Sequence, residues 1–209
     1  MKPIILNKQC IIWDWGGVCC VAGEHFANPR MLERCELTAD EMSEQCRDIE
    51  IALYLGKIDG RGFWDAVKSR FPLADFSFDE LHQSYLESYS VHNEVLHFIA
   101  NCSTNGTSAI THALLSNLGE DMSEHIVTSH RLTDLLSPRI FSHHIGAMKP
   151  DATAFDYALR EIGLPRENCV FVDDSATNVS AARELGLDSI LFVSPRQALQ
   201  ELGEFGING

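Results

Sequence analysis

The chain has 209 residues, of which 45% are hydrophobic, and its formal net charge is −14. This length is enough for one domain with a sizeable core, or for a domain with a small insertion. So acidic a surface repels nucleic acid and anionic membranes, and we expect neither as a partner. No apolar run is long enough to cross a bilayer and the N-terminal residues do not form a signal peptide, so we expect a cytoplasmic protein, monomeric or homodimeric.

The seven cysteines form no C-x-x-C pair and no zinc-binding pattern. We therefore expect reduced thiols that serve as small apolar residues. Cys19 and Cys20 follow two glycines, and a redox role for them is the alternative, although nothing near them in the sequence lowers a thiol pKa.

The first predicted strand runs from Cys10 to Trp15, and Gly16 and Gly17 follow it. A continuous apolar run is typical of a buried parallel strand. In an open α/β sheet, ligands bind beyond the carboxyl ends of such strands, so Asp14 is placed where chemistry takes place. The alternative is that Asp14 only caps a turn, because Asp is common there.

The segment from about Val21 to about Ser90 is predicted to be helical. Capping boxes at 38–41 and 77–80 open two of its helices. Gly56 ends the first of these helices, and another helix begins near Phe63. We interpret the segment as a helical insertion placed directly after the first strand.

From Asn93 onward, helices and strands alternate along the chain. After a helix at 93–100, strands are predicted at 108–115, 140–145, 169–172 and 189–193. Helices are predicted between them, with Pro150 at the first position of one and Pro195 opening the last. This alternation predicts an α/β fold with a parallel sheet and helices on both faces.

Polar side chains follow the predicted strands, and right-handed crossovers place all the strand ends at one edge of the sheet. These residues are Asp14, Ser116, Asn117, Lys149, Asp173 and Asp174. Carboxylates suit Mg²⁺, which takes oxygen ligands and often bridges to substrate phosphate. The Ser116 hydroxyl and the Lys149 ammonium suit phosphate oxygens, and Asp14 is then the nucleophile. The alternatives are a strand-end cap for Ser116, a solvated Lys149 and an N-cap for the acidic pair.

In their order along the chain, these residues resemble the four motifs of the haloacid dehalogenase-like (HAD) hydrolase superfamily. The matching segments are 13–18, with one position different, 114–117, 149–151 and 170–175. Each motif alone is weak, but four in the right order are specific. Within the superfamily, the chain is similar to sugar-phosphatase-like members and to the phosphatase domain attached to some epoxide hydrolases.

The resemblance implies a Rossmann-like core of residues 1–20 and 91–209 and a helical cap domain of residues 21–90. It implies a Mg²⁺-dependent phosphatase that acts on a small phosphorylated metabolite through an aspartyl-phosphate intermediate at Asp14, with Ser116 and Lys149 as further catalytic residues. The implied metal ligands are the Asp14 carboxylate, the Gly16 backbone carbonyl and Asp174, with Asp173 in support. The implied substrate-binding residues are Gly17, Ser116, Asn117 and Lys149.

Gly16 departs from the family pattern, because most phosphatases of the family carry Asp there as general acid and base. Such help is worth roughly 10²–10⁴ in rate, and glycine cannot supply it. Three outcomes are open: a cap residue (Glu24 or His25) or a water substitutes, the leaving group needs little help, or the protein binds phosphate esters and hydrolyses them poorly.

Two other functions stay open beside the phosphatase. A 2-haloacid dehalogenase uses the same Asp14 without a metal and is compatible with Gly16, but the pair Asp173 and Asp174 argues against it. A non-catalytic binding protein is supported by Gly16 alone.

Several other side chains have structural interpretations. His143 and His144 lack the spacing of a zinc site, and His112 is predicted to lie in the core. Trp13 and Trp15 are expected to pack rather than to stack on a substrate.

Overall fold

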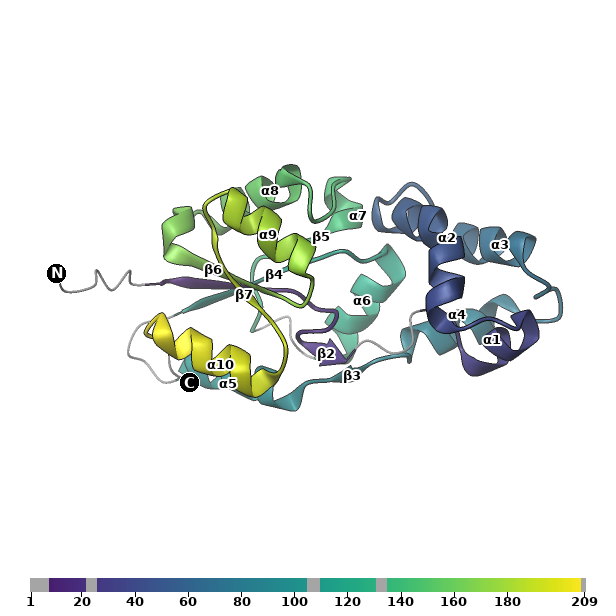
Figure 1. The fold of residues 1–209 in the computed structure, drawn as a ribbon, viewed down its shortest axis with the longest axis horizontal. Helices are drawn as coiled ribbons and strands as arrows, with labels where there is room; N and C mark the ends of the chain where they lie inside the picture. The colour runs from purple at the N-terminus through teal and green to yellow at the C-terminus, as the bar shows by residue number, and fades with distance from the viewer. Residues whose placement is uncertain (1–7, 22–25, 105–109, 131–134, 208–209) are drawn as a thin grey trace.

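The structure is a computed structural model that describes residues 8–21, 26–104, 110–130 and 135–207 (Figure 1). Its centre is a five-stranded sheet in the order β5-β4-β1-β6-β7, and every neighbouring pair is parallel. The strands are β1 (Cys10–Trp13), β4 (Thr111–Ser116), β5 (Arg139–Phe141), β6 (Cys169–Asp173) and β7 (Asp188–Leu191). The predicted α/β fold with a parallel sheet is confirmed.

Helices cover both faces of this sheet, as the alternation of elements predicted (Figure 1). On one face pack α5 (Asn93–Thr104), α6 (Glu120–Ser129) and α10 (Pro195–Glu204); on the other pack α8 (Ala152–Ile162) and α9 (Ala176–Glu184). Successive side chains of a strand point to opposite faces. Ile11 and Trp13 therefore join the first apolar cluster, and Cys10 and Ile12 join the second.

The segment between β1 and α5 carries four helices with an apolar cluster of their own. They are α1 (Pro29–Cys35), α2 (Ala39–Tyr54), α3 (Gly60–Arg70) and α4 (Phe78–Leu86). The capping box of Thr38 and Glu41 opens α2 as predicted. Ser77 caps α4 by accepting a hydrogen bond from the backbone N–H of Glu80. The predicted helical insertion is thus present after the first strand.

Two short strands pair where this helical segment joins the sheet domain. They are β2 (Cys20–Val21) and β3 (Ser90–Val91), and they run antiparallel. We call the helical segment between them the cap. Its exact limits as a domain, residues 21–90, stay a prediction.

The predicted strand at 140–145 is wrong in its second half. The strand β5 ends at Phe141, and the short helix α7 (Ser142–Ile145) follows. Side chains of this helix bond the loop after β4: the Ser142 hydroxyl accepts from the Leu118 N–H at 3.1 Å, and His143 Nδ1 lies 3.0 Å from the Leu118 carbonyl oxygen. These tertiary bonds override the strand propensity of an apolar run.

Pro150 does not open a helix, which corrects a second prediction. Asp151 is the N-cap of α8, and its side chain accepts from the Thr153 N–H at 2.8 Å. An Asp side chain satisfies a free backbone donor of the first turn, so the helix begins two residues after Pro150. Gly163 ends α8 as predicted.

Other interpretations from the sequence are confirmed. His112 is 3% exposed and accepts a hydrogen bond from Trp13 Nε1 at 3.0 Å, and burial lowers its pKa to about 4.

All seven cysteines are free, and burial raises the pKa values of Cys19 and Cys20, the latter to about 12, so neither is a reactive thiolate. Within the described ranges, no helix is long and apolar enough to span a membrane.

Two glycines let the cap and the sheet domain touch closely. Gly56, at the end of α2, has φ +65°, and a Cβ there would lie 2.7 Å from the backbone oxygen of His143. A Cβ on Gly119 would lie 2.7 Å from Cγ of Leu53. Any side chain at these positions forces the two parts of the molecule apart.

We expect Gly56→Ala to destabilise the protein more than Gly146→Ala. Gly146 has φ +64°, but nothing lies within 4 Å of a Cβ placed there. The control therefore measures the backbone strain alone, about 1 kcal/mol. The contact with His143 adds about 1–3 kcal/mol in Gly56→Ala. Urea unfolding measures both losses, and equal losses would contradict the contact.

Candidate active site

The predicted site residues meet at the carboxyl edge of the three central strands. Asp14 follows β1, Ser116 ends β4 and Asp173 ends β6. Because β4 and β6 both pair with β1, their last side chains lie on either side of Asp14. Lys149 reaches the same point from the segment between α7 and α8.

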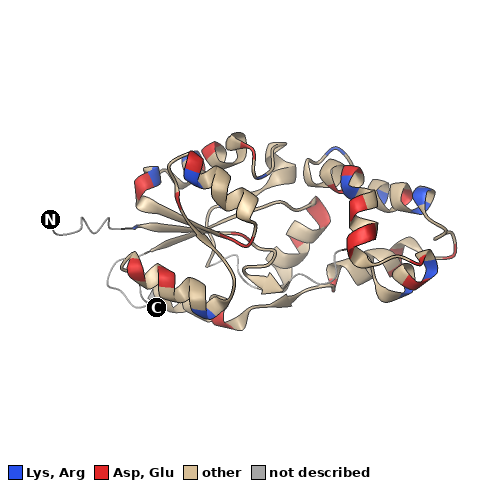
Figure 2. Ribbon diagram, viewed as in Figure 1, with Lys and Arg blue, Asp and Glu red and all other residues tan. Residues whose placement is uncertain are grey.

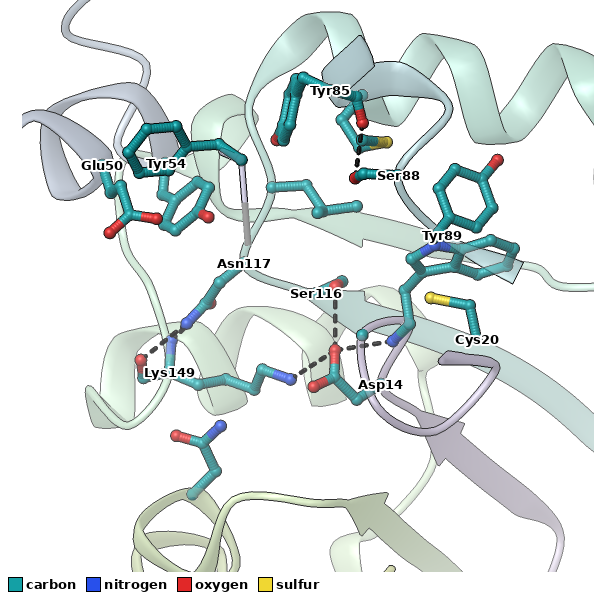
Figure 3. A pocket seen from close by; sticks show the side chains of 16 residues that line it. Asp14, Cys20, Glu50, Tyr54, Tyr85, Ser88, Tyr89, Ser116, Asn117 and Lys149 are labelled. Carbon is teal, nitrogen blue, oxygen red and sulfur yellow. Dashed lines mark hydrogen bonds and ion pairs between the residues drawn. The ribbon is translucent and has the colours of Figure 1, made fainter. Parts of the chain in front are cut away.

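The Asp14 carboxylate is buried and held in place by three donors. Its Oδ1 accepts from the backbone N–H of Trp15 at 2.7 Å and from the Ser116 hydroxyl at 2.9 Å, and it lies 2.9 Å from Lys149 Nζ (Figure 3). Burial raises the pKa of Asp14 to about 7, although the nearby Lys149 ammonium lowers it. Such a carboxylate gains from any additional cation placed beside it.

Lys149 is a buried cation between two carboxylates. It is 2% exposed, and its Nζ donates to Asp173 Oδ2 at 2.6 Å as well as pairing with Asp14. Burial alone would lower the pKa of Lys149, but the two carboxylates outweigh it and hold the pKa above its usual value. The alternative of a solvated Lys149 is therefore wrong.

Asn117 positions Lys149 through the backbone. Its amide Nδ2 donates to the Lys149 carbonyl oxygen, and its Oδ1 accepts from the Lys149 N–H, both at 2.9 Å. This two-way bond ties the end of β4 to the segment that carries the lysine. Contact of Asn117 with a substrate stays a prediction.

Asp173 is fully buried, and its carboxylate is occupied by protein donors. Besides Lys149, it accepts from the Ser175 N–H at 2.8 Å and from Asn178 Nδ2 at 3.1 and 3.2 Å. The N-cap of α9 is Ser175, whose hydroxyl accepts from the Asn178 N–H. The N-cap alternative for the acidic pair is thus wrong, and Asp173 holds Lys149 in place.

The acidic groups of this site fit a divalent cation. Carboxylate oxygens of Asp14, Asp173 and Asp174 all lie within 4.8 Å of one another. Asp174 is exposed at this edge, and burial and the Asp173 charge raise the pKa of Asp174. A Cβ on Gly17 would lie 1.9 Å from Asp174 Oδ2, so the glycine is what lets this carboxylate reach the site. Carboxylate oxygens are hard donors, the ligand type that Mg²⁺ uses.

A pocket of about 210 Å³ opens above Asp14 and is lined by both the sheet domain and the cap (Figure 3). Asp14, Gly16, Ser116, Asn117 and Lys149 form its polar end. Its other wall contains side chains that were not predicted to lie in the site, namely Phe26, Glu50, Tyr54, Tyr85, Tyr89 and Met122. Glu24 and His25 are the cap residues offered as substitutes for the general acid that Gly16 cannot supply, and they lie outside the described residues.

A signal for two of these missed residues was present in the sequence. On α2 the buried stripe is Met42, Cys46, Ile49 and Leu53. Glu50 directly follows Ile49, and Tyr54 directly follows Leu53. Because Glu50 and Tyr54 are spaced i, i+4, they share a face of α2 that lies next to the buried stripe. This shared face is the signal, although the sequence does not state which part of the molecule the face meets.

A model of the haloacid dehalogenase-like hydrolase family matches residues 9–186. The chain therefore belongs to the haloacid dehalogenase-like hydrolases, a family of enzymes, as its four motifs predicted.

Curated relatives match shorter parts of the chain. A drimenol cyclase of Aspergillus calidoustus is 44% identical over 68 residues, which are 32% of this chain and 13% of that protein. The chloroplastic flavin mononucleotide hydrolase 1 of Arabidopsis thaliana is 31% identical over 78 residues, 37% of this chain and 32% of that protein. The matches span about a third or less of these curated relatives.

Solved structures share the fold over nearly the whole chain. A HAD family enzyme of Bacteroides thetaiotaomicron superposes with a TM-score of 0.73 at 17% identity, covering 88% of this chain and 93% of that one. The same enzyme is known in complex with magnesium and inorganic phosphate. The L-2-haloacid dehalogenase of Xanthobacter autotrophicus has a TM-score of 0.61 at 16% identity, covering 96% and 84%.

We expect Lys149→Met to lower the free energy of unfolding by about 3–5 kcal/mol at pH 8, because it leaves two buried carboxylates without their cation. The control Lys57→Met removes an exposed lysine of the cap and changes stability by less than about 0.5 kcal/mol. Urea unfolding measures both.

The loss in Lys149→Met depends on pH in a direction set by Asp14. Its folded pKa, about 7, is above the value of an unfolded Asp, so the ionised carboxylate costs stability above pH 7 and this cost disappears as the pH falls. Without Lys149 that pKa rises further. The loss is therefore expected to shrink between pH 8 and pH 5, and a loss that grows in acid would contradict the assignment.

Proposed function

We propose that this protein is a Mg²⁺-dependent phosphatase that hydrolyses monoesters of a small phosphorylated metabolite through an aspartyl-phosphate intermediate at Asp14. The observation that carries the proposal is the buried Asp14 carboxylate, bonded by Ser116 and Lys149 and adjacent to Asp173 and Asp174. A nucleophile, two donors for phosphoryl oxygens and an acidic cation site are the groups that phosphoryl transfer requires.

In the first step, an oxygen of Asp14 attacks phosphorus and the bond between phosphorus and the alcohol oxygen breaks. The leaving oxygen takes a proton from water, because Gly16 carries no acidic side chain. In the second step, a water attacks phosphorus, loses its proton to solvent and releases inorganic phosphate and free Asp14. Ser116 and Lys149 donate to phosphoryl oxygens in both steps.

The residues proposed to hold the metal are the Asp14 carboxylate, the Gly16 carbonyl and Asp174, with Asp173 supporting the site through Lys149. When bound, Mg²⁺ neutralises negative charge on the phosphoryl group. The raised pKa values of Asp14 and Asp174 support this assignment, because burial and the Asp173 charge disfavour their ionised forms, which a bound cation stabilises.

Gly16 lines the pocket, and nothing lies within 4 Å of a Cβ placed on it. The Cβ of a larger residue therefore has room at this position. Two relatives support phosphate ester chemistry: the Arabidopsis protein is named as a hydrolase of flavin mononucleotide, and the Bacteroides enzyme holds magnesium and phosphate in its complex.

We expect the wild-type protein to release inorganic phosphate from a panel of phosphate monoesters with Mg²⁺ and not with EDTA. Asp14→Asn is expected to lose about 10³-fold or more of this activity, because the nucleophile is removed. Asp156→Asn, an exposed residue of α8, serves as the control and stays at the wild-type rate. Gly16→Asp is expected to raise turnover of alkyl phosphates, by up to roughly 10²-fold.

Other outcomes decide between the remaining functions of the family. Halide release from 2-chloropropionate without metal would assign the dehalogenase. Binding of phosphate esters with no turnover, in the wild type and in Gly16→Asp, would assign a binding protein.

A separate prediction tests the cation site without activity. Gly17→Ala places a methyl group against Asp174, and we expect about tenfold or more weaker Mg²⁺ binding by titration calorimetry. The control Gly163→Ala has the same left-handed backbone, φ +72° against +73°, with open space around the Cβ. Unchanged Mg²⁺ affinity in Gly17→Ala would remove Asp174 from the proposed ligands.

A further inference from the structure

A second, small cavity lies directly behind the catalytic pocket. Its volume is about 10 Å³, and residues of both the cap and the sheet domain line it. Tyr85 of α4 and Met122 of α6 line both hollows, so these two side chains form the partition between them. The other residues around the small cavity include Gly60, His82 and Asp121. The position of the partition therefore depends on how the cap is held at this place.

Asp121 reaches from the sheet domain to the cap at this cavity. It lies in the first turn of α6, at the end of that helix that faces the cap (Figure 2). Its Oδ2 lies 3.8 Å from Nε2 of His82, a residue of α4. The same oxygen lies against the first residue of α3, because a Cβ placed on Gly60 would be 1.7 Å from it. One carboxylate thus contacts two helices of the cap.

The start of α3 is a favourable place for this carboxylate. The first N–H groups of a helix have no partner within the helix and carry partial positive charge. Asp59, the N-cap of α3, accepts from the Gly62 N–H at 2.7 Å. Asp121 adds a second carboxylate at this helix end, supplied by the sheet domain. Because a side chain on residue 60 would displace that carboxylate, the glycine is what allows the contact.

His82 depends on Asp121 for its polar contact. The imidazole ring stacks on Phe78 of the same helix, with ring centroids 4.9 Å apart. Its Nδ1 is buried and has no hydrogen-bond partner among the described residues. Within the described ranges, Asp121 is therefore the polar partner of this ring. Tyr85 follows His82 by three residues, which is about one helical turn, so α4 transmits a movement of His82 to the partition.

We propose that Asp121 is a positioning residue for the proposed phosphatase reaction. Through Gly60 and His82 it holds the cap where Tyr85 and Met122 close the catalytic pocket. The inference rests on the proposed function, but the contact itself is testable without turnover. Without this contact the cap spends less time in the position that binds substrate, and the apparent affinity falls by the same factor.

The first variant, Asp121→Asn, removes the charge and keeps the shape of the side chain. With the phosphate esters that the wild type hydrolyses, we expect KM to rise about fivefold and kcat to change by less than about twofold, because the reacting groups around Asp14 are unchanged. Glu124→Gln, at an exposed position of the same helix, removes the same charge and is expected to keep the wild-type KM. A fall in kcat with KM unchanged, or an equal effect in Glu124→Gln, would overturn the proposal.

A second variant breaks the contact and leaves Asp121 in place. In Gly60→Ala the new methyl group displaces the Asp121 carboxylate, and we expect the same rise in KM as in Asp121→Asn. Because both changes remove one contact, the double variant is expected to show no further rise. Gly62→Ala is the control, since the nearest atom lies 3.3 Å from a Cβ placed there. Single effects that multiply in the double variant would mean independent causes and contradict the proposal.

Oxidation of Met122 tests the contact without any activity. Met122 is 5% exposed where the cap meets the sheet domain, whereas Met31 and Met42 are fully buried in the apolar cluster of the cap itself. Hydrogen peroxide converts exposed methionine to its sulfoxide, which peptide mass spectrometry detects. We expect Met122 to oxidise about threefold or more faster in Asp121→Asn and in Gly60→Ala, with Met31 and Met42 at their wild-type rates.

The failure of this inference differs from the failure of the proposed function. Faster oxidation of Met122 with no ester hydrolysed would overturn the phosphatase and keep the hold of Asp121 on the cap. Ester hydrolysis with a wild-type KM and unchanged oxidation of Met122 in both variants would overturn the role of Asp121 and keep the phosphatase. Equal acceleration at Met122 and Met31 would mean general unfolding, which also overturns that role.

Discussion

The site depends on one buried ammonium group placed between two buried carboxylates. Lys149 Nζ lies 2.9 Å from Asp14 and 2.6 Å from Asp173, and all three side chains are almost completely buried. An isolated charge in such a place is costly, and each of these charges is tolerated only because the others are present. The sheet order makes this possible, because β1 lies between β4 and β6 and brings their polar ends around Asp14. Asn117 and Asn178 then fix the lysine and Asp173 by further hydrogen bonds.

The same pocket has two ends of opposite character, and different parts of the chain build them. The sheet domain supplies the charged end through strand termini, whose positions are fixed by the backbone hydrogen bonds of the sheet. The cap supplies aromatic side chains of the other end, among them Tyr54 and Tyr85, and their position depends on how closely the cap approaches the sheet domain. That approach is set at Gly56 and Gly119, where neither position has room for a side chain. The polar end is thus determined by local topology, and the apolar end is determined by docking.

This difference explains which features the sequence could predict. Asp14, Ser116 and Asp173 follow apolar strands, so a parallel sheet brings them together whatever the cap does. Tyr54 and Glu50 reach the pocket only through the packing of α2 against the sheet domain, and no periodicity states which face of a helix turns toward another domain. The helix α7 was missed for a similar reason, since Ser142 and His143 bond to the distant Leu118. Asp173 was expected as a supporting residue, and the structure adds that it acts through Lys149 and Asn178.

Gly16 and the aromatic side chains of the pocket impose related demands on a substrate of the proposed reaction. In the proposed reaction, Gly16 supplies no proton to the departing alcohol oxygen, so a leaving group that carries negative charge well is favoured. Aromatic alcohols of the phenol type meet this demand, since their hydroxyl pKa is about 10, far below that of an alkyl alcohol. The wall of Phe26, Tyr54, Tyr85 and Tyr89 favours the same compounds by packing. Under the proposed function, Gly16 and the aromatic part of the pocket therefore favour the same compounds, and Asp14 keeps its role as the nucleophile.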